Sequence, residues 1–279
     1  MRFSRNTQDW LSRGAFYFLV FLIVLGCVGP FAWQIITSIK PARELTTLPP
    51  LLPSQVTVEH YIRVFERPFG KYIMNSVIVA SATTVFCLVV GSFAAYALGR
   101  LRMKGKMIIL SMVLAVSMFP EIAIVSPLYI VMRNLRLLNT YPALILPYTT
   151  FAMPLTLWIL TSFFREIPAE LEEAAKIDGC SPLQAFWKVI LPIAAPGMFT
   201  TAILVFIAAW NEFLFALTFT KTIQAQTIPV GIAMLPTMYH VPWGSIAAAS
   251  VIVTIPLIIL VLVFQRRIIS GLTAGAVKG

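Results

Sequence analysis

The chain has 279 residues, of which 59% are hydrophobic and only 11% are charged. Soluble domains carry roughly 25% charged residues, so this composition excludes an ordinary soluble domain and predicts a membrane protein with several spans. The formal net charge of +10 does not indicate a nucleic-acid partner, because the basic residues are dispersed at the ends of apolar segments, where they orient a chain in a bilayer.

Six apolar segments are long enough to cross a bilayer. We predict these spans at residues 14–39, 72–98, 107–132, 141–164, 197–220 and 244–264. Pro120 and Pro127 are expected to interrupt the third span. A secretory signal peptide is the rival interpretation of the first segment, but the apolar run continues beyond Cys27 and further spans follow. No fixed-period repeat divides the sequence, so residues 1–279 are predicted as one all-α, polytopic transmembrane domain.

The distribution of Lys and Arg predicts which ends of the spans face the cytoplasm. If segment 1–13 is cytoplasmic, thirteen of the 21 basic residues fall on inner segments and eight on outer ones. Segment 165–196 and the tail 265–279 are then also cytoplasmic. His60 and His240 fall in outer loops and are taken as surface residues, too far apart in sequence to indicate a metal site.

The one long polar stretch between apolar spans, residues 170–192, predicts a helix-turn-helix elbow. Pro168 suits the first turn of a helix, and Gly179 suits the left-handed position just past a helix end. A short helix is therefore expected from Pro168 to Asp178. Ser181 followed by Pro182 repeats the start signal, an N-cap oxygen and then a first-turn proline, and predicts a second helix.

The first helix of the elbow is expected to have an apolar face that can dock and a charged face. The apolar residues at helical spacing are Ile167, Leu171, Ala174 and Ala175. Glu172 and Lys176 form an i,i+4 pair on another side. Pro192 is expected to close the second helix after Leu191.

The spacing of residues in the elbow resembles the EAA loop of binding-protein-dependent ABC importer permeases. The matching positions are Glu173-Ala174-Ala175, Gly179, Val189 in place of the usual isoleucine, and Leu191-Pro192. The resemblance implies a six-helix, type I ABC importer transmembrane domain whose elbow is a coupling helix seated on a cytoplasmic ATPase. It assigns this contact to Glu173, Ala174, Ala175, Gly179, Leu191 and Pro192. The alternative is an ordinary loop helix of an unrelated membrane protein.

Other stretches extend the resemblance to the carbohydrate-type permeases. They include Asn75-Ser76 at the start of the second span, Pro127-Leu128-Tyr129, Trp210-Asn211-Glu212-Phe213, and the end of the chain from Gly271 to Gly279. That end is similar to the tail of the shorter permease subunits of maltose importers. The resemblance implies that Gly275, Val277 and Lys278 contact the ATPase subunits, whereas a frayed terminus is the plainer interpretation.

The resemblance also implies the partners and the location. A second homologous permease, two cytoplasmic ABC ATPase subunits, an extracytoplasmic solute-binding protein and a sugar are expected, in a bacterial or archaeal cytoplasmic membrane with both termini inside. The sequence contains no G-x-x-x-x-G-K-[ST] phosphate loop, so ATP is expected on the partner subunits and no cofactor on this chain. No nucleophile with a base and an orienting group stands out, so an enzyme is not expected.

Two acidic residues, Glu121 and Glu212, fall inside predicted spans. A charge at that depth costs about 2.5 to 3.5 kcal/mol, so each is expected to face the bundle interior or a water-filled cavity. With Trp210 and Asn211 they could line a substrate pathway, since amides and carboxylates bond sugar hydroxyls and an indole stacks on a pyranose. They could equally serve helix packing. The competing class is an ion-coupled secondary transporter or channel that uses the two acids. Within the ABC class, spans without Arg or Lys at depth favour a neutral sugar.

Overall fold

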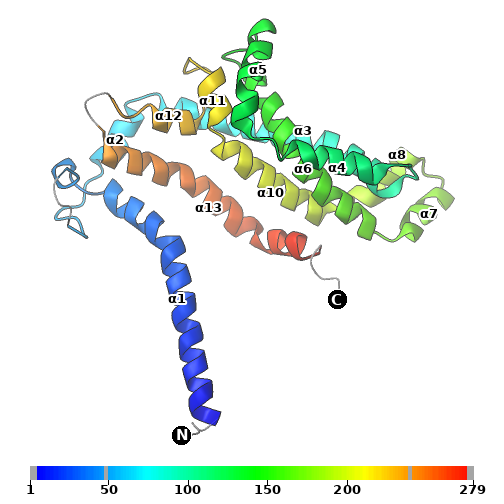
Figure 1. The fold of residues 1–279 in the computed structure, drawn as a ribbon, viewed down its shortest axis with the longest axis horizontal. Helices are drawn as coiled ribbons and strands as arrows, with labels where there is room; N and C mark the ends of the chain where they lie inside the picture. The colour runs from blue at the N-terminus through cyan, green and yellow to red at the C-terminus, as the bar shows by residue number, and fades with distance from the viewer. Residues whose placement is uncertain (1–4, 47–49, 238–240, 275–279) are drawn as a thin grey trace. The chain divides into compact units, whose positions relative to one another are not determined.

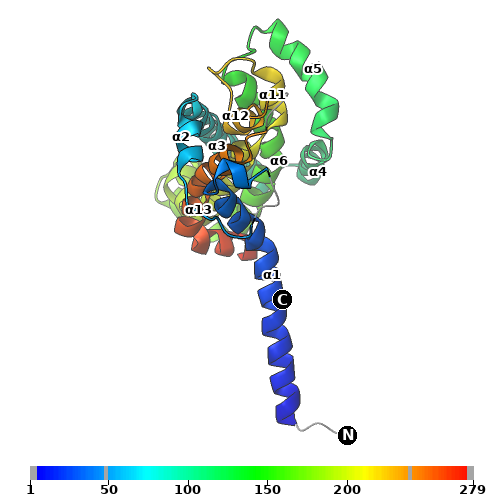
Figure 2. The same cartoon turned by 90° about the vertical axis from the view of Figure 1, so that its left-hand side faces the viewer.

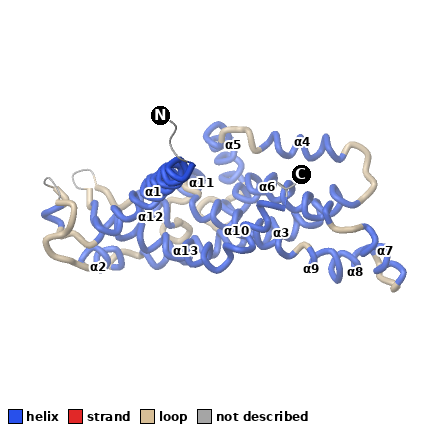
Figure 3. Tube along the Cα trace, turned by 90° about the horizontal axis from the view of Figure 1, so that it is seen from below, coloured by secondary structure: helices blue, strands red, loops and turns tan. Residues whose placement is uncertain are grey.

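The computed structural model describes residues 5–46, 50–237 and 241–274, and all regular structure in this part of the chain is helical, as predicted (Figure 3). The chain divides into two units. The first contains Met1–Arg67 and Met234–Ile255, and the second contains Pro68–Ala233 and Pro256–Gly279. The single-domain organisation predicted above stays a prediction, and each unit is described by itself.

The first unit contains α1 (Arg5–Ser38), the short helices η1 (Ala42–Glu44) and α2 (Glu59–Phe65), and the start of α13 (Trp243–Ala274). Its interior holds Lys40, whose Nζ donates to the carbonyl of Pro50 at 2.5 Å and lies 4.4 Å from the centre of the Trp33 ring. The prediction that His60 is a surface residue is wrong, because only 3% of it is exposed and its Nε2 lies 2.8 Å from the Lys40 carbonyl. Gly244 packs directly on the imidazole ring of His60, with which a Cβ on Gly244 would collide. His240 lies outside the described residues.

Three long helices form the core of the second unit: α3 (Phe69–Arg100), α6 (Pro142–Glu166) and α10 (Ala195–Asn211). They run side by side (Figure 1). Small residues allow this approach, as is usual between membrane helices. A Cβ on Gly91 would lie 2.5 Å from Cγ2 of Thr156.

The predicted third and fifth spans are broken in the structure. The third consists of α4 (Lys106–Val116) and α5 (Glu121–Asn134), which meet at 89° (Figure 2). Pro120 is the extended residue before α5, as its missing N–H favours. Pro127 lies inside α5, so the prediction that it interrupts the span is wrong. In the fifth, the backbone is extended at Glu212, between α10 and α11 (Leu214–Phe219).

Four helices are long and apolar enough to cross a membrane, and six spans result if each of two bent pairs counts as one. The single helices cover Arg13–Ser38, Phe69–Arg100, Pro142–Glu166 and Trp243–Gln265, and the pairs are Lys106–Val116 with Glu121–Asn134, and Pro182–Ile193 with Ala195–Asn211, the latter bent by 75°. These counts refer to the described ranges.

At one end of the second unit, a loop and α12 (Ile228–Ala233) are fastened to the start of α3. The Asn75 amide donates to the carbonyls of Ile223 at 3.0 Å and Gln226 at 2.8 Å, and Ser76 Oγ accepts from the N–H of Ile228 at 2.9 Å. The elbow helices α7 to α9 lie at the other end of this unit (Figure 3).

Candidate functional site: the elbow and the two acidic residues

The elbow begins with α7 (Ala169–Ile177), within one residue of the predicted ends. Gly179 has a φ of +82°, as predicted. The N–H groups of Gly179 and Cys180 donate to the carbonyls of Lys176 at 3.1 Å and Ala175 at 2.9 Å. This pair of bonds is a Schellman motif, which needs a left-handed residue at the position of Gly179.

The second part of the elbow also starts as predicted. Ser181 and Gln184 form a capping box, in which each side chain accepts a hydrogen bond from the backbone N–H of the other residue. The chain then continues through α8 (Pro182–Ala185), the π-helix η2 (Phe186–Ile190) and α9 (Leu191–Ile193). The prediction that Pro192 closes this helix is wrong, since a proline near the start of α9 is compatible with helix and the turn ends at Ala194.

The inner side of the elbow packs on the ends of α3 and α6. Phe186 is its centre: its ring lies 5.0 Å from Tyr96 and 6.2 Å from Phe164, measured between ring centroids. Ile167 belongs to this apolar cluster, and Ala175 of α7 is also buried. The elbow is therefore held to the helix ends by a hydrophobic contact.

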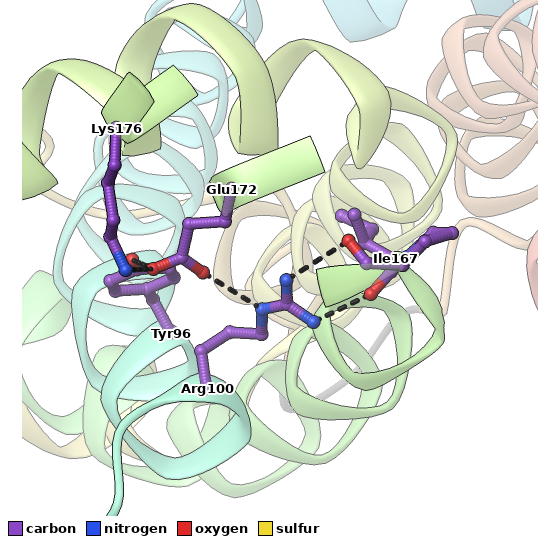
Figure 4. Close-up of polar contacts among 6 residues, drawn as sticks. Tyr96, Arg100, Ile167, Glu172 and Lys176 are labelled. Atoms are coloured by element: carbon purple, nitrogen blue, oxygen red, sulfur yellow. Dashed lines mark hydrogen bonds and ion pairs between the residues drawn. The ribbon is translucent and has the colours of Figure 1, made fainter. Parts of the chain in front are cut away.

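A charged group adds a second attachment (Figure 4). Arg100, the last residue of α3, donates from Nη1 to the Ile167 carbonyl at 2.6 Å and from Nη2 to the Pro168 carbonyl at 3.3 Å. Its Nε lies 3.3 Å from Oε2 of Glu172. The Arg100 and Glu172 side chains are only 10% and 13% exposed. One guanidinium thus joins α3, the linker after α6, and α7.

Glu172 is itself held by two further donors. Lys176 Nζ lies 3.0 Å from its Oε1, which confirms the predicted i,i+4 pair, and the Tyr96 hydroxyl donates to the same oxygen at 3.1 Å. Burial raises the pKa of Glu172, but the hydrogen bonds from Lys176, Tyr96 and Arg100 outweigh burial and leave that pKa below its usual value. The carboxylate is therefore ionised near neutral pH.

The outer side of α7 is exposed. Leu171, Glu173, Ala174 and Gly179 are accessible, and Ile177 is 86% exposed. The prediction that Ile167, Leu171, Ala174 and Ala175 share one docking face is wrong, because Ile167 lies in the extended linker before the helix and Ala175 faces inward. Of the positions assigned to ATPase contact, Ala175 is buried, Leu191 is half-buried and Pro192 is exposed. Gly275, Val277 and Lys278 lie outside the described residues.

The two acidic residues of the predicted pathway line one cavity of about 160 Å³. Its other lining residues are apolar apart from Tyr148. Both carboxylate oxygens of Glu212 accept hydrogen bonds from the start of α11, at 2.7 Å from Phe215 N–H and 3.2 Å from Ala216 N–H. Glu212 therefore caps α11 and also borders the cavity.

Trp210 and Asn211 are not among the residues that line this cavity in the described part of the chain. Trp210 is 3% exposed and stacks on Phe206, with ring centroids 5.6 Å apart. The exposed Asn211 donates to the carbonyl of Ile207 at 2.8 Å. The structure thus brings the two acids together and separates the tryptophan and the amide from them.

Comparison with known proteins identifies the family. Residues 87–273 match the family described as binding-protein-dependent transport system inner membrane component. The chain belongs to this family. The carbohydrate-type resemblance predicted from the sequence is confirmed by two relatives. The trehalose/maltose transport system permease of Thermococcus litoralis is 48% identical over 92% of this chain and 94% of its own length. The trehalose transport system permease of Mycobacterium tuberculosis is 47% identical over 96% of this chain and 99% of its own length.

A solved structure supports the fold of this permease. A chain of a bacterial ABC transporter that imports the acidic polysaccharide alginate superposes with a TM-score of 0.80 at 23% identity, covering 95% of this permease and 99% of that chain. This likeness confirms an ABC importer transmembrane fold. These relatives are named as transport permeases, and the family description makes this chain an inner-membrane component of a binding-protein-dependent transport system.

Arg100 and Tyr96 are the site residues that the sequence analysis missed, since it counted Arg100 only toward the orientation of the spans. A signal was present. Two hydrogen-bonding side chains four residues apart at the end of an apolar helix lie on one face and can share a partner.

Proposed function

We propose that this permease is a subunit of an ATP-driven importer of a neutral mono-, di- or oligosaccharide. The names of its relatives support a sugar, since they transport trehalose or maltose. Charge supports a neutral one. The lining of the cavity in the described part of the chain includes Glu121 and Glu212 but no Lys or Arg, so it offers an anionic sugar no cation to pair with.

The remaining partners follow from the same proposal. A second, homologous permease completes the translocation pathway, and two ATPase subunits in the cytoplasm bind the nucleotide, so this chain needs no cofactor of its own. Both termini are cytoplasmic, and Gly275, Val277 and Lys278 reach the ATPase subunits. The solute-binding protein delivers the sugar to the outer loops.

The observation that carries the proposal is the two-sided elbow. Its inner side is fastened to the ends of α3 and α6, and on the opposite face of α7 Glu173 and Ile177, four residues apart, are exposed. Ile177 is 86% exposed, so this face has apolar surface beside the Glu173 carboxylate that a partner can cover. In the proposed mechanism the ATPase subunits close on ATP and displace this outer side, and the packed helix ends follow.

Charge reversal on the exposed side tests this mechanism. The complete importer is reconstituted in vesicles with its binding protein, and uptake of radiolabelled trehalose and maltose is measured together with ATP hydrolysis. Glu173→Lys is expected to leave the complex assembled but to uncouple hydrolysis from uptake. Glu166→Lys is the matched control, because Glu166 is also exposed but ends α6 outside the elbow.

Each outcome bears on one part of the proposal. Normal uptake by Glu173→Lys contradicts coupling through the elbow. Uptake that runs on an ion gradient, ignores ATP and stops in Glu121→Gln or Glu212→Gln would favour the ion-coupled alternative. Faster uptake of trehalose 6-phosphate than of trehalose would contradict the neutral substrate class.

A further inference from the structure

We infer that Arg100 is a positioning residue of the transport cycle: it links α3 to the elbow, so that α3 moves when the elbow is displaced. The inference rests on the proposed coupling function of the elbow and adds the route by which the displacement reaches a helix that is not joined to the elbow in sequence.

The connectivity of the second unit creates the need for such a link. α6 runs into α7 through Ile167 and Pro168, and α9 runs into α10 through Ala194. A displacement of the elbow is therefore transmitted to α6 and α10 directly through the backbone. α3 continues instead into the loop before α4, although it packs along both α6 and α10. Only side-chain contacts can make its end follow the elbow.

Arg100 is suited to this task by its geometry. Its planar guanidinium has five N–H donors in a fixed fork, which fits two carbonyls and one carboxylate at once. The two carbonyls, of Ile167 and Pro168, belong to the linker that turns α6 into α7, and the carboxylate of Glu172 belongs to α7 itself. All three contacts are on the moving part, and the guanidinium is on α3.

The surroundings make the link stiff. The Glu172 carboxylate is oriented from two other sides by Lys176 and Tyr96, so it has little freedom to turn away from Arg100. Tyr96 lies one helical turn before Arg100 on α3, so two side chains of α3 donate hydrogen bonds to the Glu172 carboxylate. With both charged side chains about nine-tenths buried, solvent screens the pair less than it would a surface ion pair.

A set of α3 variants tests the inference in the reconstituted importer. Arg100→Gln is expected to lower sugar uptake per ATP hydrolysed by roughly 2- to 30-fold, the range for a residue that carries coupling between sites. The half-saturating concentration of the binding protein should stay unchanged, because Arg100 ends α3 beside the elbow and the binding protein is proposed to dock on the outer loops. Uptake per ATP hydrolysed in Arg100→Lys should lie between the values for the wild type and Arg100→Gln. A lysine ammonium can reach the Glu172 carboxylate but lacks the forked donors that bind the two carbonyls at the same time.

Two controls separate positioning from general damage. Arg102→Gln removes the same charge from an exposed residue two positions later and should leave coupling at the wild-type level. Glu172→Gln combined with Arg100→Gln should be no worse than Arg100→Gln alone, because both act through one contact. Additive losses, or equal uncoupling by Arg102→Gln, would overturn the inference.

The two proposals can fail separately. If Glu173→Lys uncouples the importer while Arg100→Gln assembles and couples like the wild type, only the role of Arg100 is wrong. If Glu173→Lys also couples normally, the coupling function of the elbow is wrong. If Arg100→Gln does not assemble, Arg100→Lys and the Glu172→Gln variant decide, and wild-type coupling in both would overturn the inference.

Discussion

Substitution of Gly179 gives the sharpest test of the elbow, because the structure isolates one cause. Its φ is +82°, and a Cβ built on it has no neighbour within 4 Å. A side chain here therefore causes backbone strain without a collision. The strain is about 1 to 2 kcal/mol for alanine, and it is larger for valine, whose branched side chain rarely adopts a positive φ.

A penalty of this size falls on the last turn of α7 and on the Schellman bonds, since these require the left-handed residue. One to 2 kcal/mol changes an equilibrium roughly 5- to 30-fold, so Gly179→Val is expected to lower coupled uptake by at least about that factor while the spans stay folded. Gly179→Asn should remain close to the wild type, because asparagine tolerates the left-handed region.

A matched control is available in the same unit. Gly105, the residue before α4, has a φ of +78° and also has no neighbour within 4 Å of a built Cβ. Gly105→Val therefore imposes the same strain outside the elbow and should leave uptake per ATP unchanged. The assay is sugar uptake and ATP hydrolysis by the reconstituted importer. Normal coupling in Gly179→Val, or equal uncoupling in Gly105→Val, would refute the reasoning.

Three further predictions concern packing and pH. Gly91→Ala should destabilise the permease by about 1 to 3 kcal/mol in thermal unfolding, since the new methyl meets Thr156, and adding Thr156→Ser, which removes that methyl partner, should restore most of the loss. Because the pKa of Glu172 is lowered, its ion pair stabilises the elbow at pH values above the ordinary carboxyl pKa, and this stabilisation is lost as pH falls through the lowered pKa. Hydrogen exchange of α7, corrected for intrinsic rates, should therefore be constant from pH 6 to 8 and become faster only in acid. Glu172→Gln should abolish this pH dependence. Trp210→Ala should cost about 3 to 5 kcal/mol in the same unfolding assay, whereas Asn211→Ala should change stability by about 0.5 kcal/mol or less, and equal effects would contradict the packing role given to Trp210.

The elbow was predictable because its signals are local. Gly179 and the Ser181-Pro182 pair each act on a backbone within a few residues of themselves, so their positions in the sequence suffice. The role of Arg100 was not predictable in this way, because its acceptors lie 67, 68 and 72 residues away. Proximity across that separation depends on how α3 packs against α6, which no local pattern contains.

The placement of the two acidic residues was predictable only in part. Depth in an apolar span predicts that Glu121 and Glu212 face a cavity, and the structure places both on one. The neighbours of Glu212 in sequence do not share its position, because the chain leaves the helix at that residue: Trp210 still belongs to α10 and faces its packing side. The span predicted over 197–220 was continuous and did not include this change of direction.

The elbow and the cavity are joined by the same two helices. α6 lines the cavity through Tyr148, Ala152 and Leu155 and ends at Glu166, so about 16.5 Å of helix, at 1.5 Å per residue over the 11 residues from Leu155, separates the cavity wall from the elbow. α10 starts beside the elbow at Ala195 and reaches the same cavity with Leu204 to Ala209. A helix transmits displacement along its axis because its hydrogen bonds resist stretching. In the proposed mechanism, movement of the elbow therefore reaches the cavity wall through both of these helices. If Arg100 makes α3 follow, the three packed helices are expected to move as one block rather than slide past each other.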